Sequence, residues 1–358
     1  MKRTLFCQLA IGILIVGQVG AASQKKNLGI SDPIIKVERG SAHRLFILGF
    51  VGQLVVTPSP KKSNEISYRL TKYLDPMNPS SSDEKNESLR MLSVRTSTSA
   101  DTLELRVVSS LNRSDWLKWV DVKRAPLAKL EIQAPDNMNV EIYWMHGEVK
   151  VSNWNGAVSV IAQDGHQSID EVDGDLSLKS MFGSAHVNNI HGSVTLEGFT
   201  DSINASGITG KLTLKTFASD VKLKKIVGAI NLSAQKSSVT TQDTNGAMTL
   251  QNGAASMHIK DHRGSIGGAS ESGLIDASIV GPVNAKLASV SGPLILRVPR
   301  SSEAHVSLST EKGNLNAPSS VESKKSANGK SARGHLEGKE PGFLRLTSES
   351  GDISLKFL

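Results

Sequence analysis

The chain has 358 residues, a formal net charge of +7 and a sequence pI near 9.3. Its single cysteine excludes a fold held together by disulfides within the chain. Its 41 Lys and Arg residues are balanced by 34 Asp and Glu residues, so the charge does not require a polyanionic partner, and we expect no nucleic acid partner.

The N-terminus has the three parts of a secretory signal peptide. Lys2 and Arg3 form a basic start, residues 5–19 are apolar, and the next four residues are Gly, Ala, Ala and Ser. This pattern predicts a signal peptide over 1–22 and export to the periplasm, cell surface or exterior. Cys7 lies inside the apolar stretch, so the mature chain would contain no cysteine, and we expect no transmembrane segment in it.

Residues 23–136 are predicted to form a mostly antiparallel β module that caps the repeat region at 137–300. Alternating apolar and polar residues predict strands at 44–58, 65–73, 89–96, 102–108 and 127–133. A polar stretch at 75–87, rich in Pro, Ser and Asn, is typical of a surface loop.

A strict repeat organises residues 137–300. Seven glycines are spaced 18 residues apart, at Gly156, Gly174, Gly192, Gly210, Gly228, Gly246 and Gly264. Gly147, Gly165 and Gly183 lie midway between such positions, and apolar residues fall two and four residues after most unit starts. Each half-repeat is typical of a short strand with one apolar face, which stacking can bury. The pattern predicts an all-β fold, a β-solenoid with 18-residue coils of two short strands.

The seventh residue after the start of each half-repeat is also often apolar, which predicts an inward position. One such column holds Val172, Ile190, Ile208 and Ile226, and the other holds Met181, Phe199 and Phe217. We therefore expect Phe199 and Phe217 to stack inside the rod.

The four tryptophans lie at or near the start of the regular coils, at Trp116, Trp119, Trp144 and Trp154. Two interpretations remain open. They plug the N-terminal end of the solenoid, or they form a platform on which sugars stack.

Residues 301–358 are predicted to close the rod. Short strands are expected at 294–300, 304–309 and 313–317, and a last strand at 351–355 repeats the glycine unit. Between them, 318–342 is rich in Ser, Gly, Lys and Glu without periodicity, which predicts a flexible loop.

Three pieces of the chain together resemble a known bacterial family. These are the segment LEIQAP at 130–135, the glycine series from Gly147 to Gly264, and TSESGDISL at 347–355. They are similar to the family named putative adhesin, a domain of unknown function. The resemblance implies a β-solenoid at the cell envelope and brings no catalytic residues with it.

The sequence predicts no catalytic residue, no metal and no cofactor. A calcium-binding β-roll needs an aspartate at a fixed phase in every turn, and the aspartates here fall at different phases. His258 and His262 are too weak a pair for a metal site. Asp173 and Asp175 are typical of turns, so a polysaccharide-processing β-helix enzyme is the least favoured interpretation.

One outward column offers a candidate binding face. The third residue after alternate unit starts is a small hydroxyl or amide residue, at Ser159, Ser177, Thr195, Thr213, Asn231 and Thr249. Such a row is compatible with a plain solvated face or with contact to a cell-surface glycan or envelope protein. The sequence thus favours a secreted or envelope binding module without catalysis, with a scaffold that packs or polymerises as the alternative.

Overall fold

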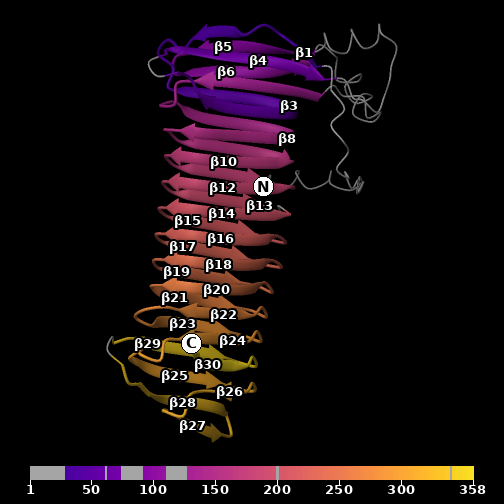
Figure 1. Cartoon of the computed structure of the whole chain (residues 1–358). Coiled ribbons are helices and arrows are strands. Elements are labelled where there is room, and N and C mark those ends of the chain that lie inside the picture. The colour runs from indigo at the N-terminus through magenta and orange to yellow at the C-terminus, as the bar shows by residue number, and fades with distance from the viewer. Residues whose placement is uncertain (1–28, 61–62, 74–91, 110–126, 199–200, 339–340) are drawn as a thin grey trace, which may run out of the picture.

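The computed structural model describes residues 29–60, 63–73, 92–109, 127–198, 201–338 and 341–358, and these form a rod of stacked β coils (Figure 1). The described residues contain strands and turns but no helix. The predicted all-β solenoid is thereby confirmed. The signal peptide at 1–22 and the loop at 75–87 fall outside these residues.

Two parallel stacks of short strands form the two broad faces of the rod. The β9 face carries β9 (Val158–Asp164), β11 (Leu176–Ser180), β13 (Val194–Gly198), β15 (Leu212–Thr216), β17 (Ile230–Ala234), β19 (Met248–Asn252), β21 (Ser265–Ser270) and β23 (Asn284–Ser289). The β10 face carries β10 (His166–Asp173), β12 (Ser184–His191), β14 (Ser202–Thr209), β16 (Asp220–Val227), β18 (Ser238–Asn245), β20 (Ser256–Arg263), β22 (Ile275–Ile279) and β24 (Leu294–Val298). Strands pair with the equivalent strand one coil away, so Leu176 lies beside Val194 and Val194 beside Leu212.

The N-terminal module mixes antiparallel pairs with an extension of the parallel stack. β3 (Arg44–Pro58) and β8 (Asn139–Trp154) are long enough to cross both faces, and they pair in parallel. β6 (Thr102–Ser109) and β7 (Leu127–Ala134) continue the stack beyond β3. The antiparallel strands β1 (Gly29–Ser31), β2 (Ile35–Glu38), β4 (Glu65–Tyr73) and β5 (Leu92–Ser99) close this end.

At the other end, the order of coils in space differs from their order in the chain. β29 (Phe343–Ser348) lies between β23 and β25 (Ala304–Thr310), and β30 (Ile353–Phe357) lies between β24 and β26 (Leu315–Asn316). The final coil is therefore inserted one place before the end of the stack (Figure 1).

A hairpin covers the last coil, within the stretch where the sequence predicted a flexible loop (318–342). β27 (Val321–Ser326) and β28 (Gly329–Leu336) pair with each other, and β28 pairs antiparallel with β25. Val321, Ala332 and Leu336 are buried, but the other strand residues of the hairpin are exposed or half-buried, so its strands are held mainly by backbone pairing and carry no regular apolar pattern in the sequence.

The two faces follow different backbone paths after their second inward residue. On the β10 face a residue in the left-handed conformation interrupts the alternation once per coil, for example Asn189 (φ 54°), Lys225 (φ 54°) and Asp243 (φ 54°). This bulge turns the next side chain inward, and Ile190 and Ile208 are fully buried.

The β9 face lacks that bulge, and one prediction fails there. The seventh position of its half-repeat points outward: Met181 is 52% exposed and Phe217 is 43% exposed. The inward residue is instead the sixth, such as Ser180 or Thr216. The expected stacking of Phe217 inside the rod is wrong, and Phe199 lies outside the described residues.

The repeated glycines are required by the distance between adjacent coils. A Cβ on Gly174 would lie 2.4 Å from the carbonyl oxygen of Gly156, and one on Gly210 would lie 2.2 Å from that of Gly192. Both separations are far shorter than the van der Waals contact between a carbon and an oxygen atom, so the corner accepts only glycine.

Candidate functional site

The predicted binding face is built from adjacent strands of the β9 face. Its six residues (Ser159, Ser177, Thr195, Thr213, Asn231, Thr249) are direct neighbours in register on β9, β11, β13, β15, β17 and β19. We call them the polar column. They alternate with fully buried residues such as Leu212 and Leu214, so the pleat directs them outward. The column presents a hydroxyl or amide about every 4.8 Å along the rod.

A polar groove of about 330 Å³ lies at the N-terminal end of this column. Its lining includes Ser159, Ser177 and Thr195 of the polar column, together with Glu141 and Arg44. Arg44 pairs with Glu141 at 2.5 Å, which leaves the two charges satisfied by each other. The groove therefore offers hydroxyls to a neutral, hydroxyl-rich ligand, with one ion pair at its end.

The other polar residues of this groove serve the backbone. The Asp175 carboxylate accepts a 2.8 Å hydrogen bond from the amide of Ser193, and Asn139 Oδ1 accepts one of 3.2 Å from Ala157. Asp175 thus has the turn role that its position in the sequence indicated. No described residue that lines the groove is a histidine or a cysteine.

A charged ladder borders the polar column on β11, β13 and β15. The Glu197 carboxylate lies 3.1 Å from the Lys179 ammonium and 3.0 Å from that of Lys215. The hydrogen bonds from Lys215 and then Lys179 lower the pKa of Glu197, which stays ionised. All three side chains reach solvent, so the ladder marks charge on the surface more than it stabilises the fold.

An apolar groove of about 660 Å³ lies beyond the ladder and shares β11 and β13 with it. Its floor is buried and includes Trp144, Ala162 and Ser180, which are neighbours in register. Its walls include three exposed apolar residues: Met145 (41% exposed), Ile161 (37%) and Met181 (52%).

Gly49 fixes the position of the indole in that floor. A Cβ at residue 49 would overlap the ring of Trp144, so the ring lies directly against the β3 backbone. The indole Nε1 donates a 3.1 Å hydrogen bond to the carbonyl of Gly52.

The two described tryptophans are core residues of β8 and form no sugar platform. They do not plug the N-terminal end either, because β3, β6 and β7 continue the stack beyond β8. Trp144 and Trp154 are 2% and 1% exposed, and the Trp154 Nε1 donates to the carbonyl of Met138 at 2.7 Å. Neither ring can stack on a sugar. Trp116 and Trp119 lie outside the described residues.

Sequence reasoning missed the apolar groove because it assigned Met181 to the core. Met181 shares the 18-residue column with Gln163 and Phe217, and the apolar members of that column indicated burial. The signal that could have separated the two faces is the presence of Gln163 and Gln235 in the same column, both of which are exposed.

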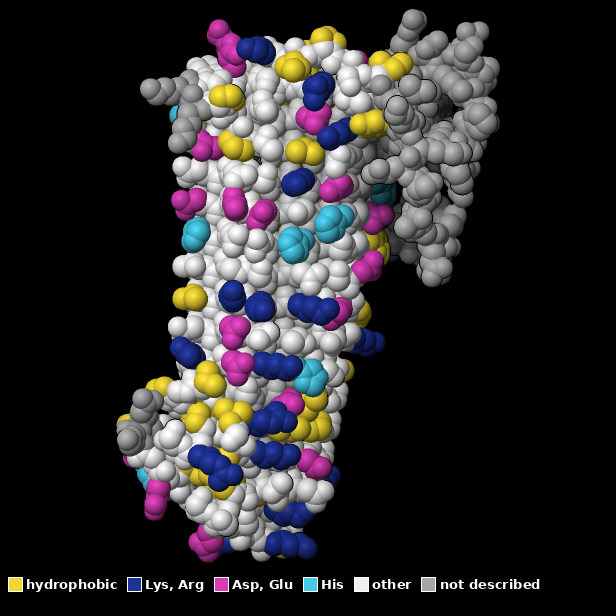
Figure 2. Space-filling view, viewed as in Figure 1, with side chains coloured by type: hydrophobic (Ala, Val, Ile, Leu, Met, Phe, Trp, Pro, Cys, Tyr) yellow, Lys and Arg dark blue, Asp and Glu magenta, His cyan; other side chains and the backbone are white. Residues whose placement is uncertain are grey.

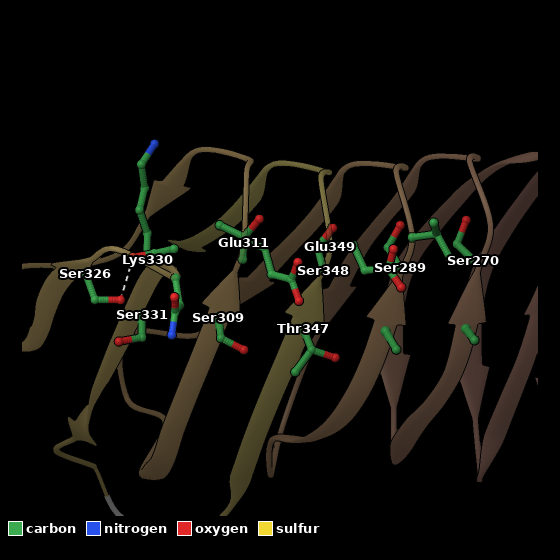
Figure 3. A pocket seen from close by; sticks show the side chains of 16 residues that line it. Ser270, Ser289, Ser309, Glu311, Ser326, Lys330, Ser331, Thr347, Ser348 and Glu349 are labelled. Carbon is green, nitrogen blue, oxygen red and sulfur yellow. Dashed lines mark hydrogen bonds between the residues drawn. The ribbon is translucent and has the colours of Figure 1, made fainter.

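A third hollow, of about 440 Å³, lies near the C-terminal end (Figure 3). Ser348, Ser289 and Ser270 lie in a row on successive strands there. The Ser289 and Ser270 hydroxyls each donate to a turn carbonyl at 2.7 Å, and Ser348 accepts from the amide of Gly351. These three hydroxyls are therefore already hydrogen-bonded within turns.

The β10 face carries mixed charge. Lysine and arginine side chains gather toward its C-terminal half (Figure 2). Part of that charge is neutralised, since Lys222 lies 3.6 Å from Asp220 and Arg297 pairs with Asp276. The described residues include no group of acidic, histidine or cysteine side chains that could hold a metal ion, and His258 and His262 do not form one.

Comparison with known proteins shows distant structural likeness only. No protein-family model matches the chain, and no curated protein matches its sequence. It is similar to a solved structure described as a putative cell adhesion protein from Clostridium sporogenes, at 11% identity and a TM-score of 0.20, over 92% of this chain and 100% of that one.

Two further solved structures come from Parabacteroides species. A putative adhesin from Parabacteroides merdae has 12% identity and a TM-score of 0.29, over 74% of this chain and 95% of that one. A putative lipid binding protein from Parabacteroides distasonis has 10% identity and a TM-score of 0.33, over 75% of this chain and 98% of that one. Adhesins recur among these names, as in the family that the sequence resembles. The similarity is too low to carry an argument about what this chain binds.

Proposed function

We propose that this chain is an exported, non-catalytic binding module of the cell envelope, and that its polar column attaches to a neutral cell-surface glycan. The observation that carries the proposal is the unbroken register of six hydroxyl or amide side chains on neighbouring strands. An extended polymer of hydroxyl-bearing units can meet such a row at many points, so that weak contacts add along its length. The predicted signal peptide at 1–22 supports export.

The structure favours this module over an end-to-end scaffold. A solenoid that polymerises needs open strand edges at its ends. Here antiparallel strands close both ends, and the outermost strand β27 carries the charged residues Glu322, Lys324 and Lys325. Charged edge strands oppose pairing with another chain.

A paired set of variants tests the proposal. The double change Thr195→Ala and Thr213→Ala removes two adjacent hydroxyls from the polar column. The matched control, Asn204→Ala with Thr240→Ala, removes two partly exposed polar groups from the β10 face. Each change should alter the free energy of unfolding by less than about 0.5 kcal/mol.

Binding is measured on immobilised neutral envelope polysaccharides and on whole cells. We expect the Thr pair to lower retention at least tenfold and the control pair to leave it unchanged. Equal retention by both variants would exclude the polar column as the binding surface.

A further inference from the structure

We propose that the apolar groove binds one long-chain fatty acid, with its hydrocarbon tail along the groove and its carboxylate toward Lys179 and Lys215. This is a second site, separate from the polar column and independent of the glycan function. It takes a different chemical class of ligand.

The walls of the groove favour a hydrocarbon chain. Met145, Ile161 and Met181 are each more than one-third exposed, yet they belong to a lining with few polar atoms. A contiguous apolar patch of this kind on a water-facing surface usually marks an interaction site. Methionine side chains are flexible and polarizable, so Met145 and Met181 can adapt to a chain of varied length.

The dimensions of the groove suit a single extended chain. Its lining residues come from six neighbouring rungs of the stack, β6, β3, β8, β9, β11 and β13. Five spacings of about 4.8 Å give a length of roughly 24 Å. The volume of about 660 Å³ falls within the range of ordinary ligand pockets.

The charges at one end favour an acid over a neutral lipid. The ladder contains one carboxylate and two ammonium groups: Glu197 lies 3.1 Å from Lys179 and 3.0 Å from Lys215. Among the described residues, one positive charge is therefore left over beside the groove, where Lys179 forms part of the lining. Arg106, also in the lining, is already paired with Glu104 at 2.5 Å.

The experiment measures binding of monomeric palmitate and of hexadecanol to the full mature chain by calorimetry. The variant Ile161→Asn with Met181→Asn makes the walls polar, and Val227→Asn is the control, since Val227 is a 50% exposed apolar residue on the β10 face. We expect one saturable palmitate site, with an affinity at least tenfold weaker in the double variant and unchanged in the control.

The charged end of the groove is tested separately. Lys179→Gln with Lys215→Gln should weaken the affinity for palmitate about fivefold and leave the affinity for hexadecanol unchanged. Circular dichroism melting shows that each variant is folded.

Four results would overturn the proposal. The first is no saturable binding of palmitate, and the second is equal palmitate binding by the native chain and by the variant Ile161→Asn with Met181→Asn. The third is binding of the protein to anionic vesicles without binding of monomeric palmitate. The fourth is palmitate binding that appears only after Trp116 and Trp119 are replaced by serine. The fourth result would mean that the segment containing Trp116 and Trp119 occupies the groove. Retention of the variant Ile161→Asn with Met181→Asn on glycan tests the polar column separately, so failure of the fatty acid site can be told apart from failure of the glycan site.

Discussion

The two faces of the rod are built from the same nine-residue unit but direct its seventh residue oppositely. On the β10 face a left-handed residue precedes that position, and Ile190, Ile208 and Ile226 are fully buried. On the β9 face the strand runs without a bulge into its corner, and Met181 and Phe217 reach solvent. One change of backbone conformation per coil therefore decides whether a column of apolar side chains builds the core or a surface groove.

Periodicity and side-chain direction are thus separate properties of a repeat. An 18-residue period places equivalent residues in register whatever their orientation. The direction of a side chain depends on the number of residues that the backbone uses between two inward positions, and a bulge adds one. Five predictions test this account of the two faces.

The corner glycines, which both faces share, should give the largest effect. Gly210 has φ of 145°, and a Cβ there would lie 2.2 Å from the carbonyl oxygen of Gly192. Gly210→Val should cost about 4 kcal/mol through backbone strain and overpacking. Gly207→Asn is the control because φ there is 64° and the neighbouring column already holds Asn189. Urea titration measures the free energy of unfolding of both variants. Equal losses for Gly210→Val and Gly207→Asn would contradict this account.

Truncation of the seventh residue separates the faces directly. Ile208→Ala removes a fully buried side chain and should cost about 3 kcal/mol. Phe217→Ala removes a larger side chain that is 43% exposed, with the Lys236 ammonium 5.7 Å from its ring centre, and should cost about 1 kcal/mol. Thermal melting ranks the two. A greater loss for Phe217→Ala would restore an inward position for this column.

The inward column of the β10 face includes one titratable residue, His262, which gives this face a pH dependence. His262 is fully buried, its Nδ1 accepts from the Thr244 hydroxyl at 2.9 Å, and its Nε2 donates to the carbonyl of Ser265 at 3.3 Å. Burial lowers the pKa of His262, and hydrogen bonds to the backbone at Ser265 and Gly246 offset this in part.

The lowered pKa means that the unfolded chain binds more protons than the folded one. The stabilisation is therefore complete above the unfolded pKa of about 6.5 and is lost as pH falls toward the lower folded value. We expect the difference in melting temperature between the native chain and His262→Gln to shrink between pH 7 and pH 5. A constant difference over that range would show that His262 does not titrate with folding.

The left-handed residue itself should give the smallest effect. Lys225 occupies the bulge with φ of 54°, a conformation that asparagine adopts more readily than lysine. Lys225→Asn should stabilise by about 0.5 kcal/mol, whereas Lys224→Asn, one residue away and outside the bulge, should not. Chemical denaturation resolves the pair. Destabilisation by Lys225→Asn would argue against the bulge at this position.

The sequence predicted the repeat, the register and the polar column because each depends on spacing alone. Ser159 and Thr249 are 90 residues apart in a chain whose coils use 18, so they must share a column. It did not predict which face carries the bulge, since Asn189, Lys225 and Asp243 have no common side-chain chemistry.

The order of the C-terminal coils was also beyond the sequence. The repeat unit that begins at Gly351 could pair with the edge of any coil. Only the three-dimensional stack shows that its strand, β30, pairs with both β24 and β26. The hairpin β27–β28 was missed for a related reason, because its few buried apolar residues, Val321, Ala332 and Leu336, do not form a periodic pattern.

Thiol labelling can read the direction of the seventh residue on each face. The chain has a single cysteine, Cys7, so Cys7→Ser provides a background in which one new thiol can be placed at each of two equivalent positions. Met181→Cys and Ile190→Cys occupy the seventh position of consecutive half-repeats on opposite faces. We expect rapid modification by a water-soluble maleimide for Met181→Cys and protection of Ile190→Cys until the protein is unfolded. Protection of both thiols, or rapid labelling of both, would contradict the opposite orientations of the two columns.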